Sequence, residues 1–104
     1  MSVIARFEIL PVGEQHMSES IARALDALDD LGVTYETTAM DTIVEAETAA
    51  EAFAAVQAAH EAAGDGRIVT SFELDDDPER ELHAADRVSA VEKAREHSAD
   101  AAKP

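Results

Sequence analysis

The chain has 104 residues, with 23 Asp and Glu against 8 Lys and Arg, and a formal net charge of −15 at pH 7. A chain of this length is expected to form one domain around a single core. The acidic balance argues against nucleic acid as a ligand, because binding a polyanion relies on Lys and Arg to neutralise phosphates. Cysteine is absent, which excludes a disulfide framework and a thiolate metal site.

The composition resembles that of proteins from extreme halophiles: Lys93 and Lys103 are the two lysines, and Asn and Trp are absent. At molar salt the Debye length is roughly 3 Å, so repulsion among carboxylates is screened. A hydrophobic content of 46% with clear periodicity favours a folded domain over disorder. We expect a domain that loosens in dilute buffer. The absence of a signal peptide and of a long apolar run predicts a cytoplasmic protein.

The first predicted element is a strand over Val3–Leu10, where apolar and polar residues alternate. A helix is predicted over residues 18–31, because apolar residues recur there at helical spacing. Ser18 or Ser20 is expected to cap its N-terminus, and Gly32 stands where a C-terminal cap belongs.

Strands over residues 33–39 and 42–46 are predicted to form a hairpin with a tight turn at residues 40–41. The sequence Thr48-Ala49-Ala50-Glu51 is a capping box that begins a second helix. A last strand follows at residues 67–75. The apolar stripe of the second helix is Phe53, Val56, Ala59 and Ala63.

The order strand, helix, strand, strand, helix, strand predicts an α+β, ferredoxin-like βαββαβ fold over residues 1–77, with both helices on one face of a four-stranded antiparallel sheet. Parity then assigns each side chain to a face. The helix-covered face receives Val3, Ala5, Phe7, Ile9, Val33, Tyr35, Thr37, Val44, Ala46, Ile68, Thr70, Phe72 and Leu74. The other face receives Arg6, Glu8, Glu36, Thr38, Glu45, Ser71 and Glu73.

That second face also carries the large apolar residues Ile4, Leu10, Met40, Ile43 and Val69, so we expect another subunit to bury it in a dimer or tetramer. Residues 78–97 are predicted to form an appended C-terminal helix, which can dock on the open sheet face of its own or a neighbouring subunit. Residues 98–104 are predicted to be a frayed tail.

Three segments together, Tyr35–Glu47, Phe7–Gly13 and Arg67–Asp75, resemble the small thiamine-binding protein family over most of the chain. Met40 matches a methionine at the hairpin turn of that family, and His60 with Glu61 matches a His-Glu pair on its second helix. The resemblance implies an oligomer of ferredoxin-like subunits that binds thiamine, or its pyrimidine half, near subunit contacts without catalysis.

The residues expected to bind this ligand cluster around the hairpin. Three carboxylates from three strands can attract the thiazolium cation, three hydroxyls can bond the aminopyrimidine, and a thioether can cover the ring. They are Glu8, Glu36, Glu45, Thr38, Thr42, Ser71 and Met40. The alternative is that the carboxylates are simply solvated, as most acidic side chains are.

No catalytic residue, metal site or cofactor is expected. The four histidines do not form the i, i+4 pair that a helical metal site needs, and Ser71 lacks a nucleophile-elbow sequence. Two other functions with the same topology stay open. One is an ACT-type regulatory module that binds an amino acid at a dimer interface. The other is a small dimeric α/β-barrel oxygenase or isomerase, against which the absence of Asn and Trp counts.

Overall fold

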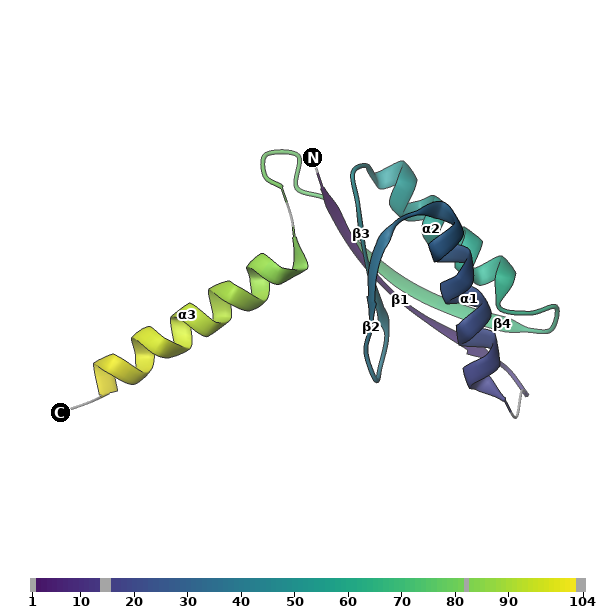
Figure 1. Cartoon of the computed structure of the whole chain (residues 1–104), viewed down its shortest axis with the longest axis horizontal. Helices are drawn as coiled ribbons and strands as arrows, with labels where there is room; N and C mark the ends of the chain where they lie inside the picture. The colour runs from purple at the N-terminus through teal and green to yellow at the C-terminus, as the bar shows by residue number, and fades with distance from the viewer. Residues whose placement is uncertain (1, 14–15, 82, 103–104) are drawn as a thin grey trace.

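The computed structural model describes residues 2–13, 16–81 and 83–102 and contains a four-stranded antiparallel sheet (Figure 1). In chain order its elements are β1 (Val3–Pro11), α1 (Met17–Leu31), β2 (Thr34–Thr37), β3 (Thr42–Ala46), α2 (Ala49–Ala62), β4 (Ile68–Asp75) and α3 (Ala84–Ala102). The strand order is β2-β3-β1-β4, so β1 and β3 are central and β2 and β4 are edge strands. This order confirms the predicted ferredoxin-like fold.

The core lies on one face of the sheet, which α1 and α2 both cover (Figure 1). Alternate residues of β1 are buried there, and the register places Phe7 beside Thr42 of β3 and Phe72 of β4. Leu28 of α1 and Val44 of β3 are fully buried. The face assignment made by parity is therefore correct for these strands. Burial of such side chains stabilises the fold by about 1.5–3 kcal/mol each.

Local signals explain where most elements begin and end. Gly32 ends α1 in the left-handed conformation at φ 71°, and its N–H donates to the Asp29 carbonyl at 3.0 Å. The capping box is also confirmed, because Glu51 N–H donates to Thr48 Oγ1 at 3.1 Å and the Glu51 carboxylate accepts from Glu47 N–H. The predicted serine cap of α1 is wrong. His16 occupies that position without a side-chain cap.

Two aromatic side chains assigned to the core are exposed. Phe53 and Phe72 contact each other edge to face, with ring centroids 5.8 Å apart. Phe72 does lie on the helix-covered face, but β4 is an edge strand, so no further strand covers its ring. Phe53 of α2 lies beside Phe72 at this edge of the sheet and is 51% exposed. Helical spacing identified the stripe of α2 but not where the sheet beneath it ends.

The C-terminal helix differs from its prediction in extent. α3 begins at Ala84 and continues to Ala102, so residues 98–102 are helical where a frayed tail was predicted. Residues 78–80 form a turn, in which Asp77 accepts bonds from Glu79 N–H and from Arg80. Alanine, the strongest helix former, occupies three of the last four positions of α3 and favours its continuation. None of the helices in the described ranges is long and apolar enough to cross a membrane.

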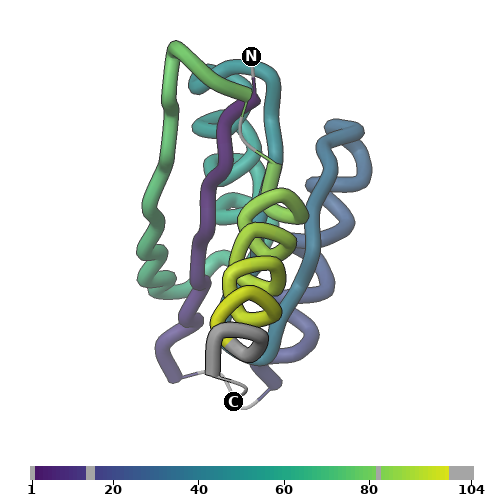
Figure 2. Tube along the Cα trace, turned by 90° about the vertical axis from the view of Figure 1, so that its left-hand side faces the viewer, coloured from purple at the N-terminus to yellow at the C-terminus, as the bar shows by residue number. Residues whose placement is uncertain are grey.

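α3 leads away from the rest of the molecule. Figures 1 and 2 show it on the open side of the sheet, diverging from the strands along its length. The longest dimension is 59 Å and the radius of gyration is 16.6 Å. A compact domain of this length would have a radius of gyration of about 13 Å. The expectation that α3 docks on its own sheet is therefore wrong in this structure, and its docking on a neighbouring subunit stays a prediction.

Candidate ligand-binding site

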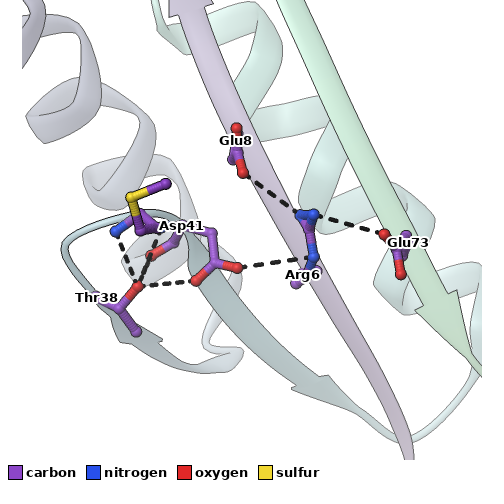
Figure 3. Close-up of polar contacts among 6 residues, drawn as sticks. Arg6, Glu8, Thr38, Asp41 and Glu73 are labelled. Atoms are coloured by element: carbon purple, nitrogen blue, oxygen red, sulfur yellow. Dashed lines mark hydrogen bonds and ion pairs between the residues drawn. The ribbon is translucent and has the colours of Figure 1, made fainter.

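The hairpin turn between β2 and β3 is organised by one hydroxyl. Thr38 Oγ1 accepts from the backbone N–H of Met40 and of Asp41, both at 3.1 Å, and donates to Asp41 Oδ1 at 2.9 Å (Figure 3). The Thr38 N–H donates to the Asp41 carbonyl at 2.8 Å. These bonds satisfy the turn locally and leave the Met40 side chain exposed. Thr38 is therefore a structural residue of the turn, and its hydroxyl already has partners.

A cavity of about 210 Å³ lies between this turn, the end of β1 and the first half of α1. Its walls combine apolar side chains from β1 and α1 with polar groups from the hairpin. The lining residues are Phe7, Glu8, Ile9, Leu10, Met17, Ile21, Ala24, Leu25, Thr37, Thr38, Ala39, Met40, Asp41 and Thr42. A concave, mostly apolar pocket with a few polar groups is the usual form of a small-molecule site.

Thr42 reaches this cavity from the helix-covered side. It pairs with Phe7 across the strands and shares its face with Val44, so it lies on the covered face, apart from the carboxylates of the open face. The residue is only 5% exposed, and its hydroxyl makes no hydrogen bond with any described residue. The hydroxyl oxygen remains accessible from the cavity, where water or a ligand can supply a hydrogen bond.

Arg6 lies at the centre of the open face, among carboxylates (Figure 3). Its guanidinium nitrogens are 3.5 Å from Glu73, 3.7 Å from Glu8 and 3.8 Å from Asp41. Arg6 Nη1 is buried and makes no hydrogen bond within the described residues. Glu8 therefore lines the cavity beside a cation that already attracts it. Sequence reasoning placed Arg6 on this face but missed its link to Asp41.

Glu45 serves a different part of the structure. Its carboxylate accepts a hydrogen bond from the backbone N–H of Ala84 and lies 3.4 Å from His83 Nδ1, so it caps the start of α3. The bond to Glu45, followed by one to Glu81, raises the pKa of His83 above its ordinary value. A contact 39 residues away along the chain gave no signal in the sequence. Glu45 therefore lies outside the hairpin cavity.

The two remaining predicted residues also lie apart. Glu36 is on the edge strand β2 and pairs with Ile43 of β3. Ser71 of β4 pairs with Glu8 of β1. Neither lines the hairpin cavity. The structure thus brings together Glu8, Thr38, Met40 and Thr42 and separates them from Glu36, Glu45 and Ser71. It adds Asp41, which the sequence had placed at the hairpin turn but not among the ligand-binding residues.

A larger hollow of about 570 Å³ lies at the opposite end of the sheet, beside Glu45, Glu51 and His83. Two of its three carboxylates are already used, because Glu51 caps α2 and Glu45 caps α3, and Glu47 is the third. The hairpin cavity offers an unbonded hydroxyl and apolar walls, so we take it as the better candidate. No group of three metal-ligating side chains forms within the ranges that the structure describes.

Comparison with known proteins identifies the family. Residues 5–92 match the family described as "Thiamine-binding protein". The UPF0045 protein of Methanothermobacter thermautotrophicus is 36% identical over 94 residues, which cover 86% of this chain and 95% of that protein. A UPF0045 protein of Mycobacterium bovis is 38% identical over 63 residues, covering 60% of this chain and 62% of that protein. The chain belongs to the thiamine-binding protein family.

Solved structures confirm the fold. A hypothetical protein from Methanocaldococcus jannaschii superposes with a TM-score of 0.78 at 25% identity, covering 86% of this chain and 95% of that one. A Thermotoga maritima protein, whose given name proposes a role in thiamine biosynthesis or salvage, has a TM-score of 0.75 at 22% identity and covers 88% and 99% of the two chains. The second likeness supports the fold alone.

Proposed function

We propose that this protein binds thiamine, or its pyrimidine half, in the hairpin cavity and does so without catalysis. The observation that carries the proposal is the match of residues 5–92 to the thiamine-binding family. The cavity at the hairpin turn supports it, because four of the seven residues expected from sequence line its wall. We further propose that the protein is a homo-oligomer and has no cofactor.

The cavity offers each kind of contact that thiamine needs. Leu10 and Leu25 provide an apolar floor, and the exposed Met40 thioether is positioned at the rim to cover a planar ring. The free Thr42 hydroxyl can bond the aminopyrimidine. The thiazolium carries a fixed positive charge, for which Glu8 is the accessible carboxylate. Both Glu8 and Asp41 lie near Arg6, but Asp41 is less available, because it is also bonded to Thr38 and is less exposed.

The side chains best suited to acid–base chemistry have structural partners, which supports binding without catalysis. His60 Nδ1 lies 2.6 Å from Thr70 Oγ1 on the outer flank of α2, and His83 is bonded to Glu45. Both lie outside the hairpin cavity. The positioned acid or base that a proton-transfer mechanism requires is therefore not supplied by these two histidines.

Titration calorimetry in 1 M KCl tests the proposal with two matched pairs of variants. Glu8→Gln should weaken thiamine binding by about 1–3 kcal/mol, because a carboxylate opposite the cation is lost. Its control, Glu45→Gln, should leave the affinity unchanged. Thr42→Val should cost about 0.5–1.5 kcal/mol. Its control is Thr34→Val, at the exposed end of β2.

The outcomes separate the function from the site. Absence of binding to thiamine and to its pyrimidine by the wild-type protein would overturn the function. Binding that neither Glu8→Gln nor Thr42→Val weakens would keep the function and refute the hairpin cavity. A loss in Glu45→Gln alone would move the ligand to the other end of the sheet. A thermal-shift series with amino acids tests the ACT-type alternative, because selective binding raises the melting temperature.

A further inference from the structure

Among the described residues, the polar contacts that hold the C-terminal helix to its own subunit lie at its base. Ala84 N–H donates to the Glu45 carboxylate, and Arg87 forms an ion pair with Asp75 at the end of β4. Beyond this first turn α3 departs from the sheet (Figure 1). Val88 and Val91 are consequently 58% and 60% exposed. They follow Ala84 at spacings of four and three, so the three residues form one apolar stripe on the helix.

The open sheet face also exposes apolar side chains that no described element of its own chain covers. Leu10 is 50% exposed, Val69 is also exposed, and Ile4 and Ile43 are half-buried. Its dimensions suit a helix of this length. α3 has 19 residues and is roughly 28 Å long at 1.5 Å per residue. The central strand β1 has 9 residues and spans roughly 30 Å at about 3.3 Å per residue.

The charges of the open face and of α3 are also complementary in part. The open face carries Glu8, Glu36, Glu45, Glu73 and Asp75 around a single arginine, Arg6. α3 carries three of the eight Lys and Arg residues of the chain, Arg87, Lys93 and Arg95, and of these Arg87 is already paired with Asp75. Arg95 follows Val91 by one helical turn, which places this cation in line with the apolar stripe. A helix laid on the face would thus bring cations to carboxylates.

We propose that the open sheet face binds α3 of a second copy of this chain, so that each subunit lends its C-terminal helix to another. Val88 and Val91, the exposed part of the stripe, pack on the apolar residues of the partner's face. Direct pairing of two open faces is less favourable, because it sets Glu8, Glu36 and Glu73 of one copy against those of the other. The proposal is independent of thiamine binding and adds a defined interface to the expected oligomer.

Cross-linking of the full-length chain tests this arrangement, and the natural absence of cysteine makes every introduced thiol unique. Val91→Cys protein is mixed, by refolding together, with ¹⁵N-labelled Ile43→Cys, Leu10→Cys or Val69→Cys protein. A short bismaleimide then joins neighbouring thiols. We expect peptides that join an unlabelled residue 91 to a labelled sheet residue. Ala90→Cys, on the opposite side of α3 from Val88, is the matched control and should give none of them.

Each other outcome overturns the proposal. Products that join only sheet residues would indicate face-to-face pairing, and products that join only residue 91 to itself would indicate paired helices. A doubly substituted Ile43→Cys/Val91→Cys chain that cross-links only within one subunit would mean that α3 folds back on its own sheet. The absence of any product would mean that the open face has no such partner.

Sedimentation provides an independent measurement. Val91→Glu should shift the protein toward the 11.1 kDa monomer, whereas Ala90→Glu should sediment like the wild type. Because both positions are exposed within the subunit, circular dichroism should show the same fold in both variants. Equal sedimentation of the two variants would contradict the proposed interface.

Discussion

The two faces of the sheet are made by the same four strands and differ in what covers them. On one face Phe7 and Val44 are buried beneath α1 and α2, and the packing is complete within a single chain. On the other face Leu10 and Val69 are exposed around the Arg6 cluster, which consists of Arg6 with Glu8, Asp41 and Glu73. Strand alternation assigns a side chain to a face, but burial depends on the neighbour that the face receives. The covered face is thus completed within one chain, whereas the open face leaves apolar side chains that the described part of the same chain does not cover.

Substituting one leucine on each face gives the largest expected contrast. Leu28 is fully buried, so Leu28→Ala should lower the free energy of unfolding by about 3 kcal/mol through lost burial and the cavity it leaves. Leu10→Ala removes a half-exposed side chain and should cost about 1 kcal/mol or less in the monomer. Urea unfolding in 1 M KCl measures both.

The protein concentration sharpens this comparison. If a partner covers the open face, the cost of Leu10→Ala should grow as the concentration rises, because association stabilises the folded state by mass action. The cost of Leu28→Ala should stay constant. Similar costs at every concentration for both leucines would mean that the two faces do not differ in the way described.

The Arg6 cluster should give a smaller effect. Arg6→Gln leaves Glu8, Asp41 and Glu73 without their shared cation and should destabilise the fold by about 1 kcal/mol, since each partly exposed pair contributes little by itself. Arg67→Gln is the matched control, because Arg67 forms no ion pair within the described residues. Its cost should stay within about 0.5 kcal/mol. Equal unfolding curves for the two variants would show that the cluster is not stabilising.

The smallest expected effect is on the pKa of Tyr35, which lies on the covered side of the sheet. Tyr35 donates to Asp29 Oδ1 at 2.8 Å, and this bond, reinforced by desolvation and by the charge of Asp29, raises the pKa of the phenol above 10.0. The stabilisation is complete below pH 10 and is lost as the pH rises through the folded pKa. Tyr35 is the single tyrosine, so its absorbance titration is unambiguous.

Two aspartate variants check the cause of that shift. Asp29→Asn should lower the titration midpoint of Tyr35 toward its ordinary value. Asp30→Asn removes a neighbouring charge that makes no contact with the phenol within the described structure and should leave the midpoint nearly unchanged. A midpoint that moves equally in both variants would point to general repulsion by the acidic chain instead of the hydrogen bond.

Local rules predicted most of the fold because its signals are local. Gly32 and the Thr48 capping box mark helix ends within a few residues, and the alternation in β1 fixes which face is covered. The predictions for Phe53 and Phe72 went wrong at the edge of the sheet, where periodicity carries no information about what lies beyond the last strand. The extent of α3 went wrong for a related reason, since the tertiary contacts found for that helix in the described part of the chain lie at its first turn and do not determine where it ends.

The site was predicted in part. Thr38 and Met40 belong to one turn, so the sequence placed them together, and Thr42 was separable from the open face by its parity with Val44. The hydrogen bond from Ala84 N–H to Glu45 and the ion pair between Arg6 and Asp41 join segments that are distant in the sequence. Such contacts depend on the strand order and on the direction in which α3 leaves the sheet, and neither is encoded in local spacing.

The attachment of α3 through one turn makes the helix a mechanical lever. Glu45 and Asp75 fix its base from two strands that lie on either side of β1. Its far end is roughly 28 Å away, so a rotation of about 10° at the base displaces that end by roughly 5 Å. A sub-ångström change in the separation of β3 and β4 is therefore magnified at the tip, where a distance label would read small strains of the sheet.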